Sequence, residues 1–154
     1  PREVARAEAI AADLAARGLA FARRSKGELP GAHTRVWLAD SYGEMGLWYR
    51  LATFALVGGG FGAVGGHNPW EAVQLGAAVL HGPNTANFRA AYAALDGAGA
   101  ARMVAPGALA QNLPSELEAD EMAARGRALA SAAAENVENL ATRLSALIGA
   151  PSYP

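Results

Sequence analysis

The chain has 154 residues, 52% of them hydrophobic and 18% charged, and a formal net charge of −1 at pH 7. This composition excludes a disordered chain and is typical of one globular domain with a core of ordinary size. The balanced charge excludes nucleic acid as the main partner, since binding to a phosphate backbone depends on clustered Lys and Arg, and the absence of cysteine excludes disulfides, thiolate metal sites and a cysteine nucleophile.

Helical and strand patterns alternate along the chain. We expect helices at residues 3–17, 44–53, 69–75 and 87–95, and a further helical stretch from residue 106 with breaks near Pro114 and Gly126. Short apolar segments predict strands at residues 19–23, 35–39, 54–57, 77–80 and 101–104. Short buried strands separated by helices are typical of a parallel sheet covered on both faces. The expected fold is therefore α/β, a Rossmann-like doubly wound parallel sheet in a single domain over residues 1–154.

The last helix, expected at residues 132–150, is amphipathic. Its apolar stripe consists of Val137, Leu140, Leu144, Leu147 and Ile148. We expect this stripe to pack on the domain or on a neighbour, without a catalytic role. The sequence contains no signal peptide and no apolar run of membrane-spanning length, which predicts a soluble chain.

A glycine-rich loop joins the strand at residues 54–57 to the helix at residues 69–75. Its glycines are Gly58, Gly59, Gly60, Gly62, Gly65 and Gly66. Glycine permits positive φ angles and a close approach of the backbone to a ligand, and the following helix directs its free N–H groups and its positive dipole end to the same place. The loop therefore predicts an anion site, and a phosphate is the expected ligand.

Other interpretations of this loop have less support. Residues 60–65 match the dinucleotide-binding pattern G-x-G-x-x-G, but residues 80–91, where the ribose-binding acid is expected, contain no Asp or Glu. A P-loop is excluded because no Gly-Lys-Ser/Thr occurs. A glycine-rich turn without a ligand remains open, although so many glycines cost backbone entropy that a plain turn does not require.

The helix start at residues 67–71 has two compatible interpretations. With Asn68 at the N-cap, Pro69 at the first helical position and Glu71 two residues later, it forms a capping box that stabilises a helix in a protein of any function. Glu71 also lies beside the predicted phosphate site, where its carboxylate is placed to accept hydrogen bonds from two ribose hydroxyls. His67 is a candidate donor to a phosphate or a sugar carboxylate, or else an ordinary polar loop residue.

Asp40 and Glu44 follow the strand at residues 35–39 and lead into the next helix. Both suit a cap or a first helical turn. Because ligands of α/β sheets lie outside the carboxyl ends of the strands, we also expect this turn to share a crevice with the glycine loop. Metal binding is not expected, since no D-x-D pair occurs and the three histidines lack the spacing of metal ligands.

Four segments together resemble one known family. They read DSYGEM at residues 40–45, VGG at residues 57–59, GGHNPWE at residues 65–71 and GPNTANF at residues 82–88. In this order they are similar to the motifs of the 3-deoxy-D-manno-octulosonic acid (Kdo) transferases, which have the two-domain GT-B glycosyltransferase fold. Two positions depart from the family pattern: Glu3 stands where a His follows Pro1-Arg2 in the family, and Trp70 replaces a Leu. Because of the first departure, a contact of residues 1–3 with the donor is not implied. The second departure changes only the packing around residue 70.

The resemblance implies that the chain is the carboxyl-terminal, donor-binding half of such an enzyme and binds CMP-Kdo. An amino-terminal half, absent from this sequence, would hold the lipid A precursor, the membrane-associating surface and the general base, so no catalytic residue is expected here. The implied reaction transfers Kdo from CMP to the lipid A precursor in lipopolysaccharide biosynthesis, without a metal ion or other cofactor, at the cytoplasmic face of the bacterial inner membrane. The chain starts at Pro1 without an initiator Met, and we expect it to be a fragment that is inactive by itself.

The resemblance also implies roles for the donor-binding candidates. The phosphate region comprises Gly65, Gly66, His67 and Asn68, and Gly58 and Gly59 are further donor-binding candidates. Glu71 is expected to bind the ribose, and the cytidine side of the cleft is expected to comprise Glu44, Met45 and Asn87. Two alternatives remain open: the donor domain of another GT-B transferase that uses a UDP-sugar, and a nucleotide-binding module without catalytic activity.

Overall fold

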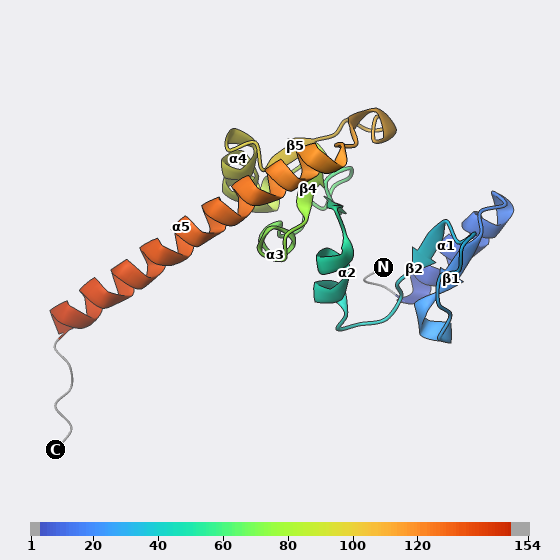
Figure 1. The fold of residues 1–154 in the computed structure, drawn as a ribbon, viewed down its shortest axis with the longest axis horizontal. Helices are drawn as coiled ribbons and strands as arrows, with labels where there is room; N and C mark the ends of the chain where they lie inside the picture. The colour runs from blue at the N-terminus through green and yellow to red at the C-terminus, as the bar shows by residue number, and fades with distance from the viewer. Residues whose placement is uncertain (1–3, 149–154) are drawn as a thin grey trace, which may run out of the picture. The chain divides into compact units, whose positions relative to one another are not determined.

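The chain divides into two compact units, residues 1–45 and residues 46–154, and the computed structural model describes residues 4–148. Each unit has its own parallel sheet, β1–β2 in the first and β3–β4–β5 in the second; Figure 1 labels β1, β2, β4 and β5. The sequence predicted one sheet in one domain, whereas no strand of the first sheet pairs with a strand of the second in the described residues. The segment Pro1-Arg2-Glu3 and residues 149–150 of the expected last helix lie outside the described part.

The first unit is a small α/β element. It consists of helix α1 (Val4–Ala16), strand β1 (Phe21–Arg23), the 3-10 turn η1 (Arg24–Lys26) and strand β2 (Val36–Leu38). The two strands pair in parallel, with Phe21 opposite Val36. The buried apolar residues of this unit are Ala7, Leu14, Ala22 and Leu38. Both strands and the helix lie where hydrophobic periodicity predicted them.

A polar cluster completes the interior of the first unit. Arg23 Nε donates to Asp40 Oδ2 over 2.5 Å, and the two side chains are 7% and 0% exposed. The Asp40 carboxylate also accepts hydrogen bonds from the backbone N–H and the hydroxyl of Ser25, at 2.8 and 2.7 Å. Asp40 is therefore a buried partner of Arg23.

The second unit carries the three-stranded sheet. Its elements, from helix α2 onward, are α2 (Met45–Leu51), β3 (Phe54–Val57), α3 (Trp70–Gln74), β4 (Ala78–His81), η2 (Ala86–Phe88), α4 (Arg89–Gly97), β5 (Ala101–Met103), η3 (Ala110–Asn112) and α5 (Glu116–Ile148). Strand β4 lies between β3 and β5, and all pairings are parallel. The predicted α/β class is confirmed.

Strand β4 is the centre of the core, because helices cover both of its faces. Val79 packs in a cluster with Val73 of α3 and with Tyr92 and Leu95 of α4. Ala78 and Leu80, which point to the opposite face, pack with Ala119 and Met122 of α5. This two-sided cover is the doubly wound arrangement expected from short strands that are apolar throughout.

Helix α5 is longer than the sequence predicted. It starts at Glu116 and continues through Gly126, where a break was expected. A side chain at Gly126 would place its Cβ 3.0 Å from Val73 Cγ1, so glycine here permits close packing of α5 on α3 and does not end the helix.

The last part of α5 runs away from the sheet of the second unit, as the orange to red ribbon in Figure 1 shows. Val137, Leu140 and Leu144 are 67%, 56% and 48% exposed, so the predicted packing of their stripe on the domain is wrong in the described part. The side chains of Leu147 and Ile148 lie outside the described part.

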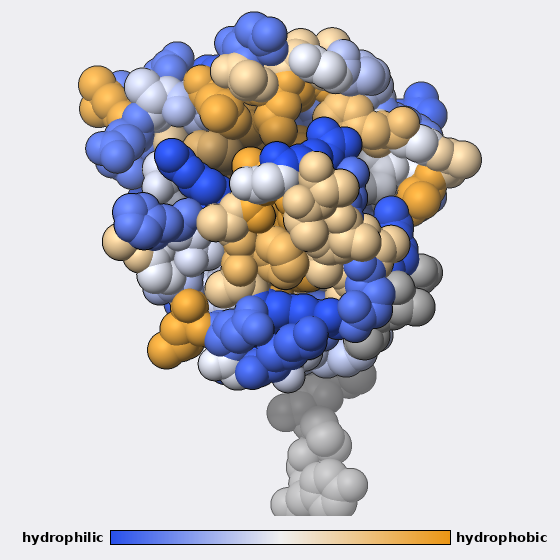
Figure 2. All heavy atoms as spheres, turned by 90° about the vertical axis from the view of Figure 1, so that its right-hand side faces the viewer, coloured by the Kyte–Doolittle hydropathy of each residue, from blue (hydrophilic) through white to orange (hydrophobic). Residues whose placement is uncertain are grey.

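Apolar side chains also reach the surface elsewhere. Figure 2 shows orange residues among blue ones on the face that it presents, and in the first unit Leu29 and Tyr42 are each 73% exposed. Scattered exposure of this kind is ordinary for a folded protein and does not mark a site by itself. Among residues 4–148, no helix has the length and apolarity needed to cross a bilayer.

Candidate functional site

The glycine loop lies at the carboxyl edge of the second unit's sheet. It follows β3, and the segment that follows β4, the central strand, lies against it. Parallel pairing of β3 with β4 places the ends of both strands at the same edge, with Val57 opposite His81. The two segments that the sequence singled out after these strands, residues 58–71 and 82–88, are thus brought together.

Hydrogen bonds between its two ends close the loop. The N–H of Gly66 donates to the Gly59 carbonyl over 3.0 Å, and the N–H of His67 donates to the Gly58 carbonyl over 3.1 Å. Gly59, Gly65 and Gly66 have φ angles of 84°, 84° and 81°. These angles lie in the left-handed region, which a residue with a Cβ adopts only under strain, so the chain path itself requires glycine there.

Two asparagines from the segment after β4 hold the carbonyl groups of the loop. The side-chain amide of Asn84 donates to the Gly62 carbonyl over 2.8 Å, and that of Asn87 donates to the Val64 carbonyl over 2.6 Å. Their backbone N–H groups donate to Gly60 and Gly65, each over 2.9 Å. Asn87, expected on the cytidine side of a cleft, thus acts in this structure as a support of the loop.

The loop's polar groups are consequently divided by kind. Six of its carbonyl groups, those of Gly58, Gly59, Gly60, Gly62, Val64 and Gly65, accept hydrogen bonds from within the protein. The N–H groups of residues 60–65 take no part in these bonds. A loop in which most carbonyls are engaged, and in which the amides of residues 60–65 form no bond within the described residues, favours a negatively charged ligand, as an anion site requires.

Direct backbone contact makes the loop compact. A Cβ at Gly60 would lie 2.8 Å from the Gly82 nitrogen, and a Cβ at Gly82 would lie 2.5 Å from the Gly60 carbonyl carbon and oxygen. Real Cβ atoms do not approach backbone atoms so closely. The two segments therefore meet at a pair of glycines, one from the loop and one from the end of β4.

The start of α3 differs from the predicted capping box. The N-cap position is Pro69, and Asn68 Oδ1 accepts the N–H of Trp70 over 3.0 Å, so Asn68 stabilises the turn before the helix. Helix α3 is five residues long, two fewer than predicted, so its dipole contributes less to the anion site and the loop amides contribute more.

The two polar candidates near this helix start, His67 and Glu71, differ in burial. His67 is half-buried, and its carbonyl accepts the Tyr92 hydroxyl over 2.8 Å. Glu71 is exposed in the first turn of α3. No hydrogen bond or ion pair of the Glu71 carboxylate occurs within the described residues, so this carboxylate is available to a ligand.

Glu44 and Met45 are the last two residues of the first unit, and Met45 is also the first residue of α2, whose other residues belong to the second unit. Arg24 Nη2 donates to Glu44 Oε1 over 2.7 Å, and the Ser41 hydroxyl also donates to this carboxylate. Bonds from Arg24 and Ser41 hold the pKa of Glu44 below its usual range, so the group is a carboxylate at neutral pH. Met45 is 45% exposed. That their turn shares one crevice with the glycine loop stays a prediction.

Arg24 is a residue that sequence reasoning missed at this turn. It follows β1 directly, and Glu44 lies in the turn that follows β2. Since β1 and β2 are parallel neighbours, their ends lie at one edge, and the basic run at residues 23–26 was the signal for a partner of Glu44.

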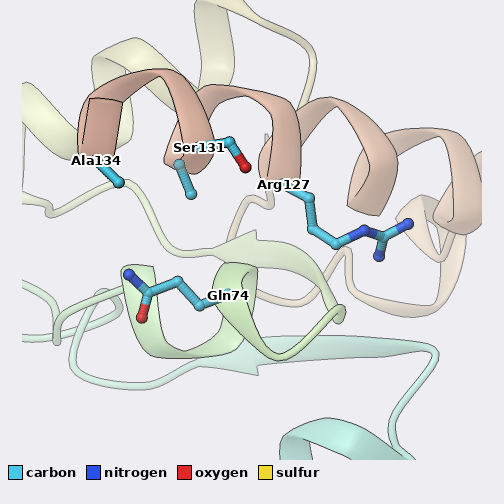
Figure 3. Close-up of a pocket in the computed structure, with 5 residues that line it drawn as sticks. Gln74, Arg127, Ser131 and Ala134 are labelled. Carbon is cyan, nitrogen blue, oxygen red and sulfur yellow. The ribbon is translucent and has the colours of Figure 1, made fainter. Parts of the chain in front are cut away.

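Hollows occur along the helices of the second unit. One cavity, with a volume of about 290 Å³, lies between α3 and α5; Figure 3 shows Gln74 of α3 across from Arg127 and Ser131 of α5. A second, of about 470 Å³, is lined by Trp70 and by residues 87–91. Of the predicted site residues, only Asn87 lines either cavity. Within the described residues no three His, Asp or Glu side chains are grouped to hold a metal ion.

The sequence of the chain is similar to those of known enzymes. Over 102 residues the chain is 47% identical to the 3-deoxy-D-manno-octulosonic acid transferase of Bordetella pertussis, a match that covers 66% of this chain and 24% of the relative. The enzyme of the same name from Haemophilus influenzae is 41% identical over 88 residues, which is 57% of this chain and 21% of the relative. The matched region is thus about a quarter of the relatives' length. No protein-family model matches the chain.

A solved structure extends the match to most of the chain. The C-terminal CMP-Kdo binding domain of WaaA from Acinetobacter baumannii is similar with a TM-score of 0.76 and 28% sequence identity, over 82% of this chain and 68% of that domain. Together with the sequence matches, this similarity confirms the resemblance carried by the four motifs. The chain is therefore related to the Kdo transferases and has the α/β fold of their C-terminal domain.

Proposed function

We propose that the chain is the part of a Kdo transferase that binds CMP-Kdo, with the glycine loop as the site for the phosphate of CMP. The observation that carries the proposal is the division of polar groups in the loop. Six carbonyls of the loop are engaged, and no bond from the amides of residues 60–65 occurs within the described residues, so these amides remain for an anion. The similar WaaA domain, described as CMP-Kdo binding, supports the same donor.

The chemistry of the proposed reaction suits such a loop. When Kdo leaves CMP, the bond between the sugar and the phosphate oxygen breaks and the phosphate gains negative charge. Fixed N–H groups stabilise that charge without a metal ion, because they are already oriented before the bond breaks. We propose that Kdo passes to a lipid A precursor in lipopolysaccharide biosynthesis, on the cytoplasmic face of the inner membrane. The acceptor, the membrane surface and the general base would be contributed by a part of the enzyme outside this chain.

Roles are proposed for individual residues in the same terms. The phosphate would contact the loop amides and the residues at the two ends of the loop. These residues are Gly58 and Gly59 at its start, and Gly65, Gly66, His67 and Asn68 at its end. The exposed Glu71 carboxylate would accept the ribose hydroxyls. Glu44 and Met45 would contact the cytosine, with Arg24 holding the Glu44 carboxylate in place. Asn87 would act through the loop, by holding the Val64 carbonyl.

Titration of the chain with nucleotides tests the donor. We expect CMP to shift the backbone amide signals of Gly60, Gly62 and Gly65 in heteronuclear NMR spectra, and UMP to shift them less at equal concentration. A preference for UMP would instead favour a UDP-sugar donor. If CMP shifts signals elsewhere and leaves the loop unchanged, the phosphate site is wrong.

Glu71→Gln separates ribose binding from helix stability. Because Asn68, and not Glu71, bonds to the start of α3, we expect the free energy of unfolding to change by less than about 0.5 kcal/mol. Loss of a charged acceptor for hydroxyl groups should raise the dissociation constant of CMP about tenfold. Calorimetric titration and thermal unfolding measure the two quantities.

The matched control for this substitution is Glu121→Gln, which removes an exposed carboxylate on α5 of the same unit. It should change neither CMP binding nor stability by a comparable amount. An unchanged dissociation constant in Glu71→Gln would remove Glu71 from the site.

A further inference from the structure

Both ring nitrogens of His81 face hydrogen-bond acceptors. Nδ1 lies 2.8 Å from the carbonyl oxygen of Gly82, and Nε2 lies 3.0 Å from Asp96 Oδ1. His81 is 3% exposed, so its ring depends on partners within the protein. A neutral imidazole has one N–H and can donate to one of these acceptors, whereas an imidazolium has two and donates to both.

The contacts of His81 reach both sides of the glycine loop. On one side, Gly82 packs against Gly60 at backbone contact distance. On the other, the His81 ring lies 4.5 Å from the ring of Tyr92, whose hydroxyl donates to the His67 carbonyl over 2.8 Å. The Tyr92 ring also lies within 3.4 Å of the place a Cβ on Gly66 would occupy. One buried ring thus supports the start and the end of the loop.

We propose that His81, as an imidazolium held by Asp96, is a positioning residue that fixes the glycine loop in the shape that binds phosphate. The bond to Gly82 holds the end of β4, and the bond to Asp96 ties that end to α4. The part of this inference that concerns phosphate rests on the proposed function. The part that concerns the two ring protons of His81 can be tested on the chain without a ligand.

Asp96 is the charged partner on which the arrangement depends. From α4 the ring also faces Tyr92, and burial raises the pKa of Tyr92 to about 12, so that phenol is neutral over the working pH range. From the neighbouring strands the residues opposite His81 are Val57 of β3 and Met103 of β5, which do not titrate. Among these neighbours, only Asp96 can compensate the charge of an imidazolium.

Nitrogen NMR of the histidine rings tests the inference without a ligand. In the unsubstituted chain we expect both His81 ring nitrogens to carry a proton at pH 7. Asp96→Asn should leave one ring proton, on Nδ1, because the amide can donate to Nε2. The same variant should shift the backbone amide signals of Gly60 and Gly66. Asp96→Glu, which keeps the charge, should restore the two protons and the signals.

The ligand provides the second readout, with Glu121→Gln on α5 as the control of equal charge change. We expect Asp96→Asn to raise the dissociation constant of CMP about tenfold, and Glu121→Gln to leave it unchanged. A single ring proton at pH 7, or loop signals and affinity unaffected by Asp96→Asn, would overturn the inference. If the unsubstituted chain does not bind CMP, the proposed function fails, and the ring protons and loop signals still decide whether His81 fixes the loop.

Discussion

Asp40→Asn is expected to lower the free energy of unfolding of the first unit by about 3 kcal/mol, because it leaves the buried Arg23 guanidinium without its buried charged partner. The substitution changes the shape of the side chain little, so the loss reports the charge and its hydrogen bonds. The bonds concerned are those from Arg23 and from the backbone and hydroxyl of Ser25. The indole N–H signal of Trp37, on β2 of the same unit, follows the unfolding during a urea titration.

The same residue predicts how the first unit responds to acid. Burial by itself raises the pKa of Asp40, but bonds from Ser25 and Arg23 outweigh burial and hold the pKa well below its usual range. Since the folded pKa is lower than the unfolded value of about 4, the stabilisation is fully present above that pH and is lost as the pH falls below it. The first unit should therefore lose stability progressively below about pH 4, and Asp40→Asn should lack this component.

Glu8→Gln is the matched control for this prediction. Glu8 accepts a bond of 2.6 Å from the same guanidinium, but its side chain is 73% exposed. Water replaces such an exposed partner, so the cost should stay below about 1 kcal/mol. The ion pair of Asp40 is not what stabilises the first unit if Glu8→Gln lowers the free energy of unfolding as much as Asp40→Asn does. The same conclusion follows if the unsubstituted chain and Asp40→Asn lose stability equally below about pH 4.

Local patterns predicted the elements of this fold well. The strand expected at residues 54–57 has those bounds, and the strand expected at residues 77–80 is shifted by one residue. Such strands are short apolar runs between turn residues, so a few neighbouring residues specify them. Which strands share a sheet is specified by contacts between distant residues, and the division into two units was for that reason not predicted.

Position and chemistry of the site were predictable to different degrees. Glycines and the Asn68-Pro69 pair marked the loop, because backbone geometry restricts residue type there. The bonds from Asn84 and Asn87 to loop carbonyls join residues 22 and 23 positions apart, and their side chains have no local pattern that reveals such partners. His81 gave no signal either, because its role comes from Gly82 and Asp96, which the fold brings to its two nitrogens.

Gly82→Ala is expected to cost the second unit about 3 kcal/mol and to weaken CMP binding more than tenfold. The added Cβ would lie 2.5 Å from the backbone of Gly60, so the loop and the end of β4 must separate. Overpacking of a contact without flexible atoms has a cost of this order. Thermal unfolding and calorimetric titration with CMP measure the two effects.

Gly62→Ala tests whether the effect of Gly82→Ala comes from the backbone contact at Gly82 or from the loss of any glycine in this region. A Cβ at Gly62 has no atom within 4 Å, and the φ angle of this residue is not positive, so the fold tolerates alanine there and stability should change by less than about 0.5 kcal/mol. Gly82→Ala and Gly62→Ala add the same methyl group, and a difference between them isolates the backbone contact. Equal stability of the two variants would mean that the loop moves aside freely. In that case its amides would not be oriented before the ligand arrives, and a phosphate would have to order them at a cost in affinity.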